Sequence, residues 1–362
     1  ESNLTWHSVP LAPLPHLCPA GCTAWDCGVH TRLSGAVPPL LQSRAGERNA
    51  VLNVGIDIGG TKIAGGVVAD DGRIVERLRV STPADTGALA QAVADMVGEL
   101  AARHDVHAVG VAAAGYIDRT RSVMLHAPNI DWHDAPLREE FESRIGRSVT
   151  LENDANAAGW GEYRFGAGQG ATDMVMLTLG TGVGGAVVGD GQLLIGANGS
   201  AAELGHVRFV RGGRPCGCGQ SGCLEQYASG RALQREIADI IDAGEIGARL
   251  AAHRGASGIV AGRDLANLLD DGDVGALEAI RRVATALGEA CGAFQAVLDP
   301  ELYVIGGGVA DLGERLLEPT RIAYETSLPG FGERPTARFV AASLGNDAGL
   351  VGVADLAGLR SR

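Results

Sequence analysis

The sequence contains one local pattern twice: an apolar strand, a glycine-rich turn, a second strand, a tight turn and a third strand. Short apolar runs bounded by glycine or by Asp-Gly pairs are typical of strands joined by hairpins. We predict these strands at residues 51–58, 63–68 and 74–80, and again at residues 173–179, 184–188 and 192–195. Longer segments with helical spacing follow each copy. The chain is therefore predicted to be α/β, with two similar lobes around a cleft.

The other periodic segments alternate between helix and strand. Apolar residues spaced along one helix face predict helices at residues 88–103, 136–145, 154–165, 224–241, 276–297, 312–327 and 348–359. Shorter apolar runs predict further strands at residues 106–112, 148–151, 302–305 and 338–342.

Charge and hydropathy narrow the possible functions. The 362 residues carry 30 basic and 43 acidic side chains, for a net charge of −13, and 46% of them are hydrophobic. A core large enough for about two domains is available. A partner bound through a basic surface, such as nucleic acid or an anionic membrane, is not expected. No apolar run approaches the ~18 residues of a transmembrane helix.

Residues 1–50 differ from the rest of the chain. They hold six of the 14 prolines, no methionine, and no helical or strand period. We expect a disordered leader there, in which Cys18, Cys22 and Cys27 lack the regular scaffold of a metal site. The prolines also interrupt the apolar stretch that a secretory signal needs, so a cytoplasmic protein is expected.

The first glycine-rich turn runs from Asp57 to Lys62 between two predicted strands. Without a Cβ, Gly59 and Gly60 let backbone N–H groups approach a phosphate, and Thr61 adds a hydroxyl donor. Asp57 ends its strand and could hold Mg²⁺ directly or through water. The turn lacks the strand–loop–helix frame of a Walker loop, and an ordinary hairpin is the alternative.

The second glycine-rich turn, Gly180-Thr181-Gly182, again lies between two predicted strands. Two such hairpins facing each other across a cleft would hold the phosphates of a nucleotide from both lobes. A third glycine segment, with Gly307 and Gly308, follows a later strand and could accept an adenine ring or a ribose edge. A plain strand-to-helix turn is the alternative there.

Asn153 and Asp154 stand at a predicted strand-to-helix junction. In the functional interpretation, Asp154 accepts a proton from a substrate hydroxyl, and Asn153 hydrogen-bonds a neighbouring hydroxyl. Phosphoryl transfer needs such an acceptor, in line with the γ-phosphate. The alternative is structural, because an acidic residue near a helix N-terminus can simply be a cap.

His206, Cys216, Cys218 and Cys223 supply one imidazole and three thiols, the four ligands of a closed tetrahedral zinc site. Glycines between the cysteines let the chain fold tightly around a metal. Because no ligand position is left for water, we predict structural and not catalytic zinc. Free thiols in a loop are the alternative.

Glu203 and Glu225 flank this cluster in the sequence. A rigid metal loop would hold both carboxylates in place, and paired carboxylates that accept several hydroxyl hydrogens suit a sugar. Solvated surface glutamates are the alternative.

Together these residues resemble the ROK family, which contains bacterial sugar kinases and sugar-responsive repressors. The resemblance covers residues 51–359. Residues 194–206 are similar to the family signature, with differences at Asn198, Ser200 and Ala201, and His206 with the three cysteines is similar to its zinc motif. Residues 152–170 and 216–233 are similar to the glucokinases of high-GC bacteria in particular.

The resemblance implies an actin-like ATPase (ribonuclease H-like) fold. A small N-terminal domain would span residues 51–163, completed by the helix at residues 346–362, and a larger C-terminal domain with the zinc loop would span residues 164–345. It also implies a hexokinase-type reaction, the ATP-dependent phosphorylation of glucose at the 6-hydroxyl, with Mg²⁺ beside the nucleotide and structural Zn²⁺.

The resemblance further assigns roles by position. Asp154 matches the general base of the family, and the two glycine-rich turns match its phosphate loops. Its sugar contacts match Asn153, Asp154, Glu203, His206 and Glu225. His206 would serve twice, with one ring nitrogen on zinc and the other on the sugar.

Three alternatives stay open. A kinase for another hexose, such as N-acetylmannosamine, mannose or fructose, would carry similar motifs. Polyphosphate could replace ATP as donor, although the intact first turn fits ATP. A sugar-sensing repressor needs a basic helix-turn-helix before the sugar domain, for which residues 1–50 are too short and too rich in proline. The expected partners are glucose and ATP, without nucleic acid or membrane, in a homo-oligomer (dimer or tetramer).

Overall fold

The computed structural model describes residues 51–127, 130–330 and 332–361. Residues Asn49–Arg362 form one compact unit. The leader expected at residues 1–50, with its three cysteines, lies outside the described residues. None of the described helices has the length and hydropathy needed to span a bilayer.

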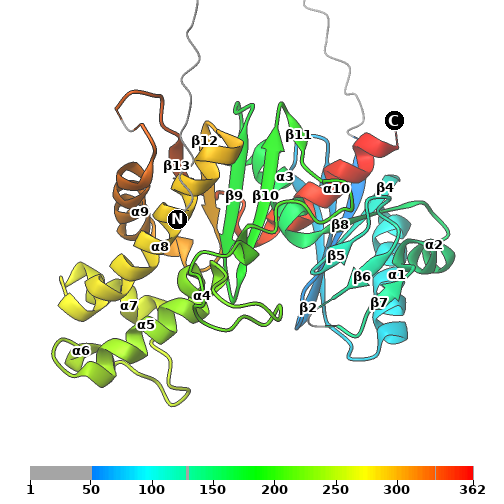
Figure 1. Cartoon of the computed structure of the whole chain (residues 1–362). Helices are drawn as coiled ribbons and strands as arrows, with labels where there is room; N and C mark the ends of the chain where they lie inside the picture. Colours follow the sequence, from blue (N-terminus) through cyan, green and yellow to red (C-terminus); the bar gives the residue numbers. More distant parts are fainter. Residues whose placement is uncertain (1–50, 128–129, 331, 362) are drawn as a thin grey trace, which may run out of the picture. The chain divides into compact units, whose positions relative to one another are not determined.

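Two five-stranded sheets with the same strand order organise this unit (Figure 1). The first sheet is, in spatial order, β3 (Ile74–Ser81), β2 (Lys62–Ala69), β1 (Leu52–Ile58), β4 (Val106–Ala113) and β8 (Val149–Asn153). The second is β11 (Gln192–Leu193), β10 (Val183–Gly189), β9 (Met174–Leu179), β12 (Leu302–Gly306) and β13 (Arg338–Ala341). In each sheet an antiparallel meander of three strands is extended by two parallel strands, so the predicted repeat is confirmed.

Helices pack against both sheets. The described helices are α1 (Thr86–Arg103), α2 (Leu137–Ile145), α3 (Asp154–Phe165), α4 (Glu225–Ala228), α5 (Gly230–Ala243), α6 (Ala248–Ala252), α7 (Gly262–Asp270), α8 (Val274–Leu298), α9 (Glu314–Ser327) and α10 (Ala348–Arg360). Buried residues of α1, α2 and the first sheet form one hydrophobic core. Those of α5, α7, α8, α9 and the second sheet form another. Each sheet therefore has a core of its own.

Helices α3 and α10 connect the two sheets. A Cβ at Gly352 of α10 would overlap the carbonyl oxygen of Ala157 in α3, so only glycine permits this approach. Helix α10 also packs against β1 and β4, whereas α3 packs against β10. The junction that begins α3, where Asn153 and Asp154 lie, is thereby held between the sheets.

Several elements differ from the prediction. The single helix predicted over residues 224–241 is wrong: Ser229 separates α4 from α5, because its side chain accepts the backbone N–H of Ala232 as an N-cap. Helices α6 and α7 were not predicted, and β11 is shorter than the strand predicted at residues 192–195. A third sheet was also missed, formed by β5 (Tyr116–Ile117), β6 (Met124–His126) and β7 (His133–Ala135).

Candidate functional site

Asn153 and Asp154 lie where β8 ends and α3 begins. Asn153 is the N-cap of α3, because its Oδ1 accepts the backbone N–H of Asn156 over 3.0 Å. Its Nδ2 donates to the carbonyl oxygen of Gly115 over 3.0 Å. Asp154 is the first residue of the helix, and its Oδ1 accepts the N–H of Ala155 over 2.9 Å. The capping role therefore belongs to Asn153, not to Asp154.

Asp154 belongs to an acidic cluster with Asp57, at the end of β1, and Glu203, which precedes the short helix η1 (Leu204–His206). Burial raises the pKa of Asp154 above its ordinary value. Burial and the negative charge of Asp154, partly opposed by Lys62, raise the pKa of Asp57 to about 7. Burial and the same negative charge raise the pKa of Glu203 to about 7. Such a half-buried cluster favours bound cations and hydroxyl donors.

The first glycine-rich turn joins β1 to β2. The N–H of Gly59 donates to the carbonyl oxygen of Lys62 over 3.0 Å, which closes the turn. The hydroxyl of Thr82 donates to the carbonyl oxygen of Gly59 over 2.6 Å and braces it. Gly60, Thr61 and Lys62 are exposed, so the backbone of the turn and the Thr61 hydroxyl are accessible to a ligand.

The second glycine-rich turn joins β9 to β10 in the equivalent position of the other sheet. The N–H of Gly180 donates to the carbonyl oxygen of Gly182 over 3.0 Å, and Thr181 is exposed. The N–H of Gly230, the first residue of α5, donates to the carbonyl oxygen of Gly180 over 2.8 Å. The start of α5 is thus fixed against the turn.

The third glycine segment lies beside the second turn. The N–H of Val309 donates to the carbonyl oxygen of Leu179, at the end of β9, over 3.1 Å, while Gly307 and Gly308 are exposed. A hollow of about 360 Å³ opens next to this segment, between α5 and α7. Its lining includes Gly230, Leu233, Arg263, Leu265, Gly308 and Leu312. The side chains from α7 were missed because that helix was not predicted.

The predicted metal ligands assemble into one cluster. The ligand atoms of His206, Cys216, Cys218 and Cys223 all lie within 4.8 Å of one another. Nδ1 of His206 is 3.7 Å from Sγ of Cys216, and the sulfur atoms of Cys218 and Cys223 are 3.6 Å apart. Neighbouring ligands around tetrahedral zinc are about 3.4–3.8 Å apart, from the usual metal–ligand bond lengths. The donor set and its spacing could therefore hold zinc.

Glu225 begins α4 and lies between this cluster and the second glycine-rich turn. Its Oε2 accepts the backbone N–H of Val183 over 3.2 Å. Its Oε1 lies 3.7 Å from Sγ of Cys216. The prediction of Glu225 as a sugar contact did not anticipate the link to the turn.

A buried ion pair beside Asn153 was also missed. Nη2 of Arg121 lies 2.9 Å from Oε1 of Glu152, and the two side chains are 3% and 0% exposed. Burial raises the pKa of Glu152 and lowers the pKa of Arg121, while the charge of each partner opposes the shift of the other. The only signal in the sequence was an acidic residue, Glu152, next to the strand-to-helix junction.

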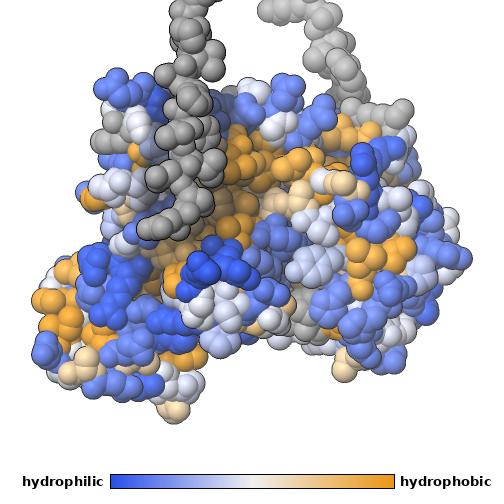
Figure 2. Space-filling view, in the orientation of Figure 1, coloured by the Kyte–Doolittle hydropathy of each residue, from blue (hydrophilic) through white to orange (hydrophobic). Residues whose placement is uncertain are grey.

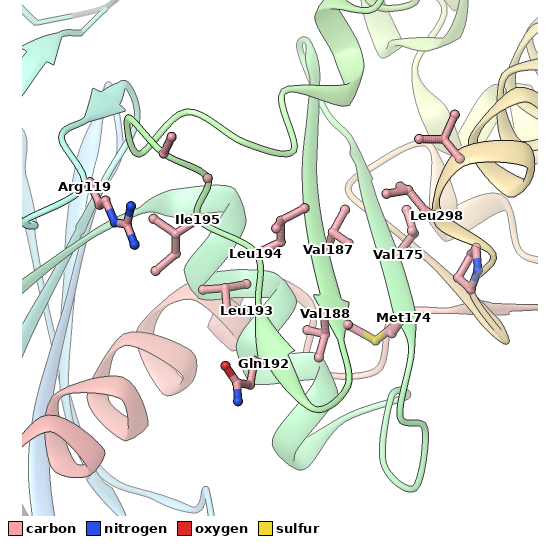
Figure 3. A pocket seen from close by; sticks show the side chains of 15 residues that line it. Arg119, Met174, Val175, Val187, Val188, Gln192, Leu193, Leu194, Ile195 and Leu298 are labelled. Carbon is pink, nitrogen blue, oxygen red and sulfur yellow. The ribbon is translucent and has the colours of Figure 1, made fainter.

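A larger hollow lies apart from the predicted site residues. Apolar surface gathers over β9, β10 and β11 (Figure 2). A groove of about 720 Å³ opens there (Figure 3), bounded by β9, β10, residues 192–197, Arg119 and Leu298. None of the residues predicted to bind phosphate, sugar or metal lines this groove.

Known proteins are similar to this chain over nearly all of its described length. A glucokinase of Streptomyces coelicolor is 44% identical over 308 residues, which are 84% of this chain and 97% of that protein. An N-acetylmannosamine kinase of Yersinia pseudotuberculosis is 32% identical over 310 residues, 83% of this chain and 96% of that protein. The crystal structure of a ROK family glucokinase from Streptomyces griseus, in complex with glucose and AMPPNP, superimposes with a TM-score of 0.76 at 45% identity, over 85% of this chain and 99% of that one.

The sequence profile of the ROK family itself matches residues 53–359, which include both glycine-rich turns, the acidic cluster and the metal ligands. This chain therefore belongs to the ROK family.

Proposed function

We propose that this protein is an ATP-dependent glucokinase, which transfers the γ-phosphoryl group of ATP to the 6-hydroxyl of glucose. The observation that carries the proposal is Asp154, a half-buried carboxylate with a raised pKa that begins α3 beside Asp57 and Glu203. The identity to a glucokinase, 44%, exceeds the 32% identity to an N-acetylmannosamine kinase, which favours glucose as the acceptor.

In this proposal Asp154 is the general base. It takes the proton of the 6-hydroxyl as that oxygen bonds to the γ-phosphorus and the bond from phosphorus to the ADP oxygen breaks. Burial makes its carboxylate a stronger base than a solvated aspartate. Asn153, Glu203, His206 and Glu225 hydrogen-bond the remaining hydroxyls. Asn153 uses one amide N–H on Gly115, and its second N–H is left for the sugar.

The nucleotide lies against the glycine segments. Backbone N–H groups of the exposed residues Gly60, Thr61 and Thr181, with the hydroxyls of Thr61 and Thr181, bind the phosphates. The hollow of about 360 Å³ beside Gly308 takes the adenosine. Asp57 would hold Mg²⁺, which when bound offsets negative charge on the phosphate oxygens. The raised pKa of Asp57 supports this role, because a carboxyl held above its usual pKa gains most from a neighbouring cation.

His206 and the three cysteines would hold zinc as a structural ion, whose binding free energy adds to folding. Nδ1 of His206 faces Cys216, which leaves Nε2 for a sugar hydroxyl. Metal binding would in this way fix the orientation of a sugar ligand.

We also propose that residues 51–163 with 346–362 form one lobe and residues 164–345 the other. The packing of α10 on β1 and β4 supports this division. The lobes would close over both substrates and exclude water, which otherwise competes for the phosphoryl group. The protein is expected to be a dimer or tetramer, which light scattering would measure.

The test is a panel of acceptors and donors with the purified full chain. Glucose, mannose, fructose and N-acetylmannosamine are each supplied with MgATP or with polyphosphate, and sugar phosphate and ADP are quantified. We expect the highest kcat/KM for glucose with ATP, and a product phosphorylated at O6. A higher kcat/KM with another hexose or with polyphosphate would reassign that substrate. Absence of sugar phosphate with every sugar and both donors would refute the kinase proposal.

A further inference from the structure

We propose that Arg121 is a positioning residue for phosphoryl transfer, acting through Glu152 on the first turn of α3 and so on Asp154. The inference rests on the proposed function, because it assumes that the reaction is phosphoryl transfer with Asp154 as the base. The contacts that support it do not depend on which sugar is bound.

Glu152 holds both partners of the N-cap hydrogen bond of α3. Its Oε1 accepts the backbone N–H of Asn153 over 3.0 Å and Nδ2 of Asn156 over 3.1 Å. The same oxygen faces Nη2 of Arg121 at 2.9 Å. Asn153 and Asn156 are joined to each other by the cap, and Asp154 lies between them in the chain. A shift of the Glu152 carboxylate should therefore displace the first turn of α3, which contains Asp154.

Arg121 reaches Glu152 from a turn that is itself tightly held. It lies between β5 and β6 with a φ of 57°, in the left-handed region that arginine rarely adopts. The carboxylate of Asp118 accepts the backbone N–H groups of Ser122 and Val123, both over 2.8 Å. Although burial acts in the opposite direction, hydrogen bonds from the turn lower the pKa of Asp118 to about 2. An unfavourable backbone conformation and a buried charge thus coincide at one residue, which is typical of functional sites.

The same hairpin, residues 115–123, also touches the segment that leads to Glu203. A Cβ at Gly199 would overlap the carbonyl oxygen of Ile117, so the two backbones are in direct contact. Figure 3 shows Arg119 of this hairpin directed toward Ile195 of that segment. The hairpin therefore contacts both the N-cap of α3 and the segment that leads to Glu203, a carboxylate of the acidic cluster.

A buried ion pair can also be purely structural, so the test has to separate position from stability. The double variant Arg121→Met/Glu152→Gln removes both charges and keeps an oxygen acceptor for Asn153 and Asn156. We expect its kcat to fall about 10–100-fold, the usual effect of losing a residue that orients a reacting group. We expect KM for ATP to change less than about twofold, because the hydrogen bonds that Glu152 accepts come from Asn153 and Asn156, which lie outside the glycine-rich turns.

The deciding measurement repeats this comparison in an Asp154→Ala background. If the pair acts by positioning Asp154, it should cost less than about twofold where no base remains to be positioned. An equal fold-loss in both backgrounds, or no loss in the wild-type background, would overturn the inference.

Two further variants keep the test decisive. Tyr324→Phe removes buried hydrogen bonds with Gln295 and Ala337 and is expected to lower Tm with kcat unchanged, which gives the effect of instability alone. If the double variant does not fold, Arg121→Lys replaces it under the same criteria, since it keeps the charge but not the planar guanidinium. A wild-type protein without kinase activity would refute the proposed function, whereas an active wild type with unaffected variants would refute only the role of Arg121.

Discussion

Oε2 of Glu225 accepts the backbone N–H of Val183 over 3.2 Å, a hydrogen bond that joins the metal-ligand loop to the second glycine-rich turn. A Cβ at Gly182 would overlap the same carboxylate oxygen, so the turn is packed directly on Glu225. The other oxygen faces the sulfur of Cys216. One side chain therefore contacts both the cluster that would hold zinc and the turn proposed to bind phosphate.

This link predicts that Glu225 affects the binding of both substrates. Glu225→Ala should raise KM for ATP and for glucose about 10–100-fold each, the range for losing a hydrogen bond to a charged group. Glu225→Gln keeps an acceptor for Val183 and should raise mainly KM for glucose. Initial rates with each substrate varied in turn measure this, with the exposed Glu245→Ala as control. A Glu225→Ala variant that changes KM for glucose alone would show that the turn does not depend on the carboxylate.

Cys218→Ser should lower both zinc content and Tm. Cys218 is exposed, so its replacement loses little packing, and a fall in Tm would come from the lost metal ligand. Metal analysis and thermal melting measure the two effects. Cys291→Ala is the matched control, because this thiol is buried in the core among apolar side chains. It should lose stability while keeping the zinc content of the wild type. Full zinc content in Cys218→Ser would contradict the ligand assignment.

Sequence patterns predicted those elements whose apolar residues, as spaced in the sequence, are the residues buried in the structure. Strands β1 and β9 are buried apolar runs that end in glycine-rich turns, and both were predicted within a residue or two. Strands β5 to β7 have two or three residues each, too few to show a period of two. Ser229 interrupts a helical period that continues on both sides, so the break depends on a capping hydrogen bond and not on the apolar pattern.

The candidate site also contains features that the local sequence predicts and features that depend on contacts between distant segments. Both glycine-rich turns and the metal ligands are compact in sequence, and general chemistry identifies them. The pairing of Arg121 with Glu152 arises only when β5, β6 and β8 come together, so no local pattern could predict it. The contact of Glu225 with Val183 likewise joins residues from separate motifs.

The acidic cluster predicts that stability falls as pH rises toward neutrality. Asp57 and Glu203 have pKa values of about 7 in the folded protein, compared with about 3.9 and 4.3 for unfolded Asp and Glu. The folded protein therefore binds more protons between about pH 4 and 7, and the free energy of unfolding decreases across this window as pH increases. Asp57→Asn and Glu203→Gln should each raise Tm of the ligand-free protein at pH 8 by on the order of 1–3 °C, with little effect at pH 4.

Thermal melts across this pH range measure the difference. Glu318→Gln, at an exposed position of α9, is the control and should give a curve parallel to that of the wild type. Curves for Asp57→Asn and Glu203→Gln that also run parallel to the wild type would show that neither carboxyl is protonated on folding.

Asp154→Asn should lower kcat by ~10²–10⁴-fold, the range for a positioned base, with glucose binding retained. Because the charge of Asp154 raises the pKa of both Asp57 and Glu203, the variant should also show a weaker pH dependence of Tm. Asp273→Asn is the matched control, since Asp273 caps α8 and asparagine caps equally well. Rates and calorimetric glucose binding measure the first effect. Near-normal turnover by Asp154→Asn would exclude Asp154 as the base.

Helices α3 and α10 cross so closely at Gly352 that any side chain at this position should destabilise the fold. At Gly352 the added methyl group of alanine would overlap the carbonyl oxygen of Ala157, so Gly352→Ala should destabilise the fold by about 1–3 kcal/mol. Ala157 lies within one turn of Asp154 on α3, and a helix pushed away from α10 carries Asp154 with it, so kcat should fall as well.

Gly98→Ala is the matched control: this glycine is exposed within α1 with open space around it, and alanine should add roughly 0.5–1 kcal/mol of stability. Denaturant unfolding and kcat measure both variants. A Gly352→Ala protein that matches the wild type in both would mean that the helices separate without cost and that their close contact does not position Asp154.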